Sequence, residues 1–130
     1  MVAGPVALCA EQPLRAPVHP RRNVEDFAPV EAKFIRFSIS ATTRAEPCFD
    51  EMEIYGPEDP AKNLALADAG TVVTASGTYA DYRIHALRHL NDGLYGNAHS
   101  WICNHVEGWV ALELPRPAKI NRIVWSRDRL

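Results

Sequence analysis

The clearest feature of the amino-acid sequence is a regular alternation of apolar and polar residues in short segments. Residues 34–39 (FIRFSI) place Ile35, Phe37 and Ile39 on one side of an extended chain and other residues on the opposite side. An alternation with a period of two is typical of a strand with one buried face. We therefore expect a strand here, with these three side chains in the core.

A second alternating segment covers residues 50–55 (DEMEIY). Met52 and Ile54 fall on one side of the chain, and Glu51 and Glu53 fall on the other. Acidic side chains are mostly found in contact with water. The segment therefore predicts a strand with a buried methionine and isoleucine and a solvated pair of glutamates.

Three further segments favour β-structure because they are short, rich in apolar or β-branched residues, and bounded by turn residues. They are residues 71–75 (TVVTA), 109–114 (WVALEL) and 120–125 (INRIVW). Pro115 and Pro117 should separate the last two, since proline cannot donate a backbone hydrogen bond. Helix is expected only as about one or two turns over residues 84–90. About five strands without intervening helices indicate the all-β class, as an antiparallel sandwich or barrel.

The charge and composition of the chain argue against some classes of binding partner. The chain has 130 residues, a formal net charge of −2 and only short clusters of basic residues, which argues against nucleic acid or an anionic membrane as the partner. No apolar run reaches the roughly 20 residues of a transmembrane helix, and the apolar N-terminus lacks the basic residues of a signal peptide. The 3 cysteines, Cys9, Cys48 and Cys103, are an odd number, so they predict either one disulfide or free buried thiols.

Short segments of the second half follow one another in a distinctive order. They are residues 63–66 (NLAL), 73–76 (VTAS), 90–93 (LNDG), 100–101 (SW), 108–115 (GWVALELP) and 120–128 (INRIVWSRD). In order and spacing they resemble the first half of a discoidin domain, also called the coagulation factor 5/8 type C domain. Residues 33–39 (KFIRFSI) and 48–56 (CFDEMEIYG) resemble the closing strand pair of the same domain. The family is galactose-binding-like and similar to carbohydrate-binding modules, and repeats of this style resemble those of large secreted bacterial proteins.

The resemblance implies an antiparallel jelly-roll β-sandwich whose two halves appear in reversed order and whose middle strands are missing. The chain is then either an incomplete piece that spans the junction of two repeats, which we favour, or a circularly permuted domain, because domain termini often lie close together. The expected organisation is an extended lead-in or linker over residues 1–32, a closing strand pair over 33–56, a linker over 57–62 and the first half of a discoidin-like domain over 63–130.

The resemblance also implies one structural calcium ion (Ca²⁺). Calcium takes oxygen ligands from carboxylates, amides and carbonyl groups. The expected ligands are Asp92 in the Asn-Asp-Gly turn, Asn97 and Ser100 in the same loop, and the closing-strand residue Glu51. Glu51 and Asp92 can share a site only if both halves of the chain belong to one sandwich. The alternative is a plain turn beside an exposed strand glutamate.

Members of this family bind sugars or other ligands with the loops at one end of the sandwich. An aromatic ring can stack on the apolar face of a sugar, and polar side chains can hydrogen-bond its hydroxyl groups. The loop residues with this chemistry are Tyr79, Tyr82, Arg83, His99 and Asn104, unless they are ordinary loop residues. Trp101, Trp109 and Trp125 match core or strand positions of the family instead.

A third group of residues could hold zinc. His85 and His89 are four residues apart, and Cys103 lies near His105. Four such side chains can bind zinc tetrahedrally, but the spacing matches no zinc finger or metalloprotease motif. The sequence contains no P-loop, dinucleotide fingerprint or nucleophile elbow, and we expect no catalytic residues.

The sequence therefore predicts a non-catalytic ligand-binding or adhesion module of a larger secreted protein. Its expected partners are a carbohydrate or other extracellular ligand and the neighbouring domains of the parent protein. By resemblance, its location is extracellular or periplasmic. Two alternatives remain, a structural spacer repeat beside a catalytic domain and a small zinc-dependent enzyme.

Overall fold

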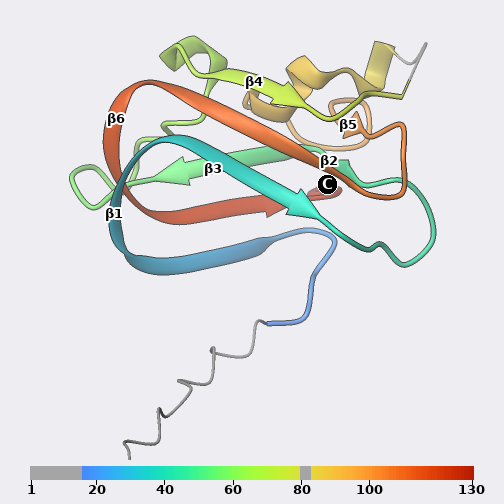
Figure 1. Cartoon of the computed structure of the whole chain (residues 1–130), viewed down its shortest axis with the longest axis horizontal. Coiled ribbons are helices and arrows are strands. Elements are labelled where there is room, and N and C mark those ends of the chain that lie inside the picture. Colours follow the sequence, from blue (N-terminus) through green and yellow to red (C-terminus); the bar gives the residue numbers. More distant parts are fainter. Residues whose placement is uncertain (1–15, 80–82) are drawn as a thin grey trace, which may run out of the picture.

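The structure is a computed structural model in which residues 16–79 and 83–130 are described (Figure 1). This part of the chain contains six strands: β1 (Asn23–Ile39), β2 (Cys48–Phe49), β3 (Glu51–Tyr55), β4 (Val72–Ala75), β5 (Trp101–Ile102) and β6 (Gly108–Ser126). Every pairing between them is antiparallel. The expected all-β class with antiparallel sheets is therefore confirmed.

Helical structure in the described residues is limited to three short 3-10 helices. They are η1 (Ala67–Ala69), η2 (Arg83–His85) and η3 (Leu87–Asn91). The helical turns expected over residues 84–90 correspond to η2 and η3. None of the described helices has the length and apolar character needed to cross a membrane.

Two long strands, β1 and β6, pair along their length and bend back together at one end of the molecule (Figure 1). Their pairing slips at the bend: Ala32 faces Ala118, whereas Phe34 faces Glu113. Residues 114–117 therefore have no paired residue in β1. An irregularity of this kind allows a strand to bend sharply.

Because of the bend, the first half of each long strand lies in one layer and its second half lies in the other (Figure 1). β4 pairs with the first half of β6, with Val73 opposite Leu112. β3 pairs with the second half of β6, with Met52 opposite Trp125. β2 and β5 form a separate two-stranded sheet. The layers face each other as an antiparallel sandwich, in which residues 48–55 and residues 72–126 share the same sheets.

The structure corrects two expectations about the strands. β6 continues through Pro115 and Pro117, so the expectation that these prolines separate two strands is wrong. Both prolines lie at the bend, where β6 has no paired residue in β1, and a missing amide hydrogen costs no hydrogen bond between those strands there. β1 also begins earlier than expected, because residues 23–32, expected as lead-in, form its first half.

The apolar residues of the alternating segments face the interior, as expected. Met52, Ile54, Val110 and Leu112 have no exposed surface, and Ile35 is 9% exposed. Each fully buried side chain of this size contributes about 1.5–3 kcal/mol to folding. The alternation in the sequence therefore identifies the main part of the core.

Aromatic side chains join the two layers with the small β2–β5 sheet. The ring of Phe37 meets those of Phe49 and Trp125 edge-on, with centroids 5.2 and 5.1 Å apart. Phe49 also stacks on Trp101 at 6.0 Å. Trp101 and Trp125 are buried, as expected, whereas Trp109 is half-buried beneath the guanidinium group of Arg36.

Candidate functional site

Glu51 and Glu53 of β3 are buried, which corrects the expectation of a solvated pair. Their exposed fractions are 0% and 5%. Oε1 of Glu51 accepts a hydrogen bond from the backbone N–H of Gly93 at 3.1 Å. Glu53 forms an ion pair with Arg129 and accepts a hydrogen bond from the hydroxyl group of Tyr95. The outer face of β3 is therefore covered by the loop after η3 and by the last residues of the chain.

Asp50, which precedes β3, holds the same two segments in place. Its Oδ2 accepts hydrogen bonds from the backbone N–H groups of Gly96 at 3.0 Å and Arg129 at 2.8 Å. Its Oδ1 accepts the hydroxyl hydrogen of Ser126. The strand pair that resembles the end of a discoidin domain is thus tied directly to the loop that resembles its beginning.

Burial changes the chemistry of Glu51. Loss of water contact raises the pKa of this carboxyl group from 4.5 to about 9. The hydrogen bond from Gly93 lowers the pKa but does not offset this increase, and the nearby charge of Asp92 raises it further. Its Oε2 atom is buried without a hydrogen-bond partner among the described residues. Glu51 is therefore a neutral acid near pH 7 in the protein alone.

A turn after η3 brings two histidines to one aspartate. Oδ2 of Asp92 lies 2.8 Å from Nδ1 of His89 and 3.2 Å from Nδ1 of His99. The chain between the aspartate and His99 reverses at Gly93 and Gly96, whose φ angles of 79° and 96° favour glycine. Among the described residues, these three side chains form a cluster that could hold a metal ion. Their ligand atoms all lie within 4.8 Å of one another.

The structure does not assemble the zinc ligands considered from the sequence. His85 contacts the hydroxyl group of Ser100 at 2.7 Å, and Cys103 is buried, whereas His105 is exposed. Of that set, His89 alone belongs to the cluster with Asp92. No local pattern in the sequence points to His99 as the partner, because two histidines ten residues apart meet only when the loop between them folds back.

The expected calcium ligands lie around the same loop, but several of their oxygens are already engaged. Oδ1 of Asp92 accepts the N–H of Leu94 at 2.9 Å. The hydroxyl group of Ser100 contacts His85 and donates to the backbone carbonyl of Asn97, whose side chain is exposed. Oε2 of Glu51 is the buried oxygen that a cation could still use, so calcium stays a prediction.

Four of the expected ligand-binding residues flank the short strand β5. The backbone N–H of Tyr79 donates to the carbonyl of Ile102 at 2.8 Å, and the backbone N–H of Ser100 donates to the carbonyl of Ile84 at 3.2 Å. These bonds place Tyr79 and Arg83 beside β5, while His99 precedes the strand and Asn104 follows it. The fifth expected residue, Tyr82, lies outside the described residues.

The two cysteines in the described residues, Cys48 and Cys103, are free thiols. Burial raises the pKa of the Cys48 thiol above its usual value, although a hydrogen bond with Ser100 opposes the increase. A raised pKa disfavours the thiolate, which is the reactive form of cysteine. Cys48 therefore has the character of a structural cysteine.

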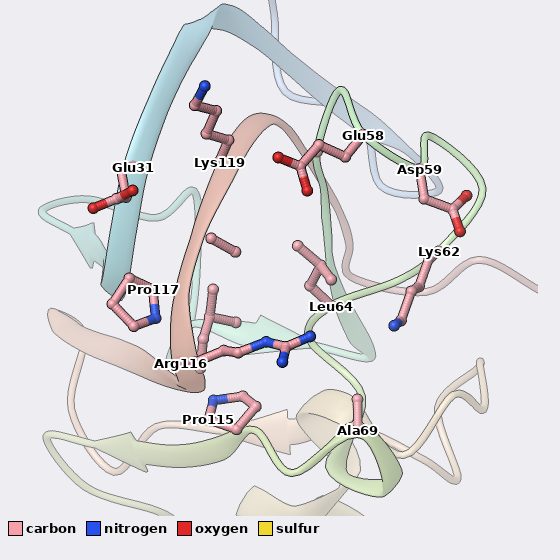
Figure 2. Close-up of a pocket in the computed structure, with 13 residues that line it drawn as sticks. Glu31, Glu58, Asp59, Lys62, Leu64, Ala69, Pro115, Arg116, Pro117 and Lys119 are labelled. Atoms are coloured by element: carbon pink, nitrogen blue, oxygen red, sulfur yellow. The ribbon is translucent and has the colours of Figure 1, made fainter.

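A pocket among the described residues lies at the opposite end of the fold, inside the bend of β6. Its volume is about 610 Å³. Figure 2 shows Arg116 extending from the bend toward Leu64. The charged residues of the lining are three acids and three bases: Glu31, Glu58, Asp59, Lys62, Arg116 and Lys119. The lining has no aromatic ring and no excess of either charge, and none of the expected ligand or calcium residues contributes to it.

Comparisons of the chain with models of protein families, with curated proteins and with solved structures give no match. The discoidin resemblance therefore rests on the sequence segments described above. The antiparallel sandwich agrees with it in fold class, and the jelly-roll topology stays a prediction.

Proposed function

We propose that the chain is a non-catalytic ligand-binding module and that its ligand is a carbohydrate. The main support is the position of Tyr79, Arg83, His99 and Asn104 at the two ends of β5, where two stretches of the chain meet. Such a convergence on a rigid sandwich is the usual way in which loops form a binding face. We call these four residues the β5 face.

The side chains of the β5 face suit a sugar. Tyr79 is 43% exposed, so its ring offers an apolar surface on which a pyranose can stack. Arg83 and Asn104 are exposed as well, and their N–H groups can donate hydrogen bonds to hydroxyl oxygens. The pocket at the bend of β6 lacks the aromatic ring, which makes it the less suitable site.

A glycan array followed by calorimetric titration tests this proposal. Tyr79→Ala should weaken binding about tenfold, because aromatic stacking contributes about 0.5–1.5 kcal/mol beyond the buried area. Arg83→Ala should weaken it as well. Two matched controls should bind normally: Phe34→Ala removes an exposed aromatic ring from β1, and Arg116→Ala removes the arginine of the pocket.

Three results would count against the proposal. A well-folded sample that binds no glycan would favour the structural spacer. Loss of binding in Arg116→Ala with none in Tyr79→Ala would move the ligand to the pocket at the bend. Turnover of a substrate by the purified chain would contradict the non-catalytic assignment.

The proposal includes a structural calcium ion and an extracellular or periplasmic location within a larger protein. Both rest on the discoidin resemblance, and the free buried oxygen of Glu51 supports the calcium ion. A cation that binds only the native state raises the melting temperature, and Asp92→Ala should abolish that increase. An unchanged melting curve in saturating calcium would contradict the calcium site.

A further inference from the structure

We propose that His89, Asp92 and His99 form a binding site for a divalent transition metal of the zinc class. One ligand atom from each of the three side chains lies within 4.8 Å of the other two. In a tetrahedral zinc site with bonds of about 2.0–2.1 Å, the ligand atoms are about 3.3 Å apart. The observed separations from the aspartate oxygen, 2.8 and 3.2 Å, need only small adjustments to admit the ion.

The hydrogen bond on the far side of the His89 ring supports a metal at its Nδ1 atom. Nε2 lies 3.0 Å from the backbone carbonyl oxygen of Arg83. A carbonyl oxygen only accepts, so Nε2 carries a ring hydrogen, and in the tautomer with this single hydrogen the Nδ1 atom presents a lone pair. That lone pair faces the Asp92 carboxylate, which also accepts. Either a proton on Nδ1 or a metal cation between the two atoms removes this conflict, and we propose the metal.

The same bond is the usual support of a metal-binding histidine. Ligating imidazoles commonly donate their second ring N–H to a backbone carbonyl or carboxylate, which fixes the ring and its tautomer. Asp92 is fixed in a similar way, because its Oδ1 accepts the N–H of Leu94 at 2.9 Å and leaves Oδ2 directed at the histidines. The site is therefore largely formed before the metal binds.

The donor atoms select the class of metal. Two imidazole nitrogens and one carboxylate oxygen suit zinc, nickel or copper, whereas calcium takes six to eight oxygens. The side chain of His89 is 10% exposed, and that of His99 is 37% exposed. Three protein ligands leave one tetrahedral position open, and the partly exposed side of His99 gives water or a ligand oxygen access to it.

Metal titration of the full chain tests the site. The protein is treated with a chelator, dialysed, and titrated with zinc chloride by calorimetry. The wild type should bind one equivalent of zinc at this site, and His99→Ala and Asp92→Asn should each weaken binding at least about tenfold. Both variants are mild, since His99 is partly exposed and asparagine can still accept from Leu94. His105→Ala, an exposed histidine outside the cluster, should bind zinc like the wild type.

Cobalt provides a second readout that separates histidine ligands from cysteine ligands. The bound cobalt should show visible bands of a nitrogen and oxygen site without a sulfur charge-transfer band. The site would be overturned by the absence of zinc binding, by equal zinc affinity in His99→Ala and His105→Ala, or by a sulfur band. The cluster would then be an ion pair between protonated histidine and Asp92. The inference does not depend on the proposed carbohydrate ligand, because metal binding is measured without glycan.

Discussion

Replacement of Glu51 by glutamine should stabilise the protein at neutral and alkaline pH. The pKa of Glu51 is about 9 in the folded chain and 4.5 ordinarily. Between these values the folded state keeps a proton that the unfolded state has released. The folded state thus binds more protons, and its stability must fall as the pH rises through this window.

The size of the effect follows from the two pKa values. Each pH unit inside the window costs about 1.4 kcal/mol, so an increase from about pH 5.5 to about pH 7.5 costs up to about 3 kcal/mol. Glutamine removes this cost because it cannot ionise. Its carbonyl oxygen can still accept the N–H of Gly93, and its size matches the cavity. For a chain of this length, 3 kcal/mol corresponds to a change in melting temperature of roughly 10 °C.

Thermal unfolding followed by circular dichroism, in buffer with a chelator, measures this effect. The difference in melting temperature between Glu51→Gln and the wild type should increase by roughly 10 °C from about pH 5.5 to about pH 7.5. Glu58→Gln, which changes an exposed glutamate, should show no such growth. Parallel melting curves for the wild type and Glu51→Gln at both pH values would refute a raised pKa for this group.

Two further predictions concern stability and are measured by urea unfolding. Asp50→Ala should cost about 3 kcal/mol or more, because it leaves the backbone N–H groups of Gly96 and Arg129 without their acceptor in a buried site; a loss below about 1 kcal/mol would contradict the bridging role. Trp101→Ala should cost about 3–5 kcal/mol, and Trp109→Ala less than half of that, because Trp101 has no exposed surface and Trp109 is half-buried; equal losses would contradict the assignment of the core.

The parts of the fold that the sequence predicted are those set by local periodicity. Met52, Ile54 and Leu112 are buried. They occupy alternate apolar positions of their strands, so the local pattern alone places them on the apolar face. The expectation that β6 ends at Pro115 was wrong. Proline interrupts a strand only where a neighbouring strand needs the backbone N–H that proline lacks. That condition depends on the bend, which no local pattern reveals.

The candidate sites depended more on distant contacts, and the sequence predicted them less well. Glu51 and Glu53 have the spacing of a solvated strand face, yet residues far along the chain, such as Gly93 and Arg129, cover them. The cluster of histidines around Asp92 likewise exists only because the loop after η3 turns back. The residues of the β5 face follow from their chemistry in the sequence, whereas the backbone hydrogen bonds that bring Tyr79 and Ile84 beside β5 join distant parts of the chain.

The central claim, that the β5 face binds the ligand, is tested most directly by an NMR titration of the isotope-labelled chain with the best glycan from the array. Binding at this face should shift the backbone signals of Tyr79, Arg83, His99 and Asn104, and leave those of Arg116 and Lys119 in place. Shifts confined to the pocket at the bend of β6, or the absence of any saturable shift, would contradict the claim.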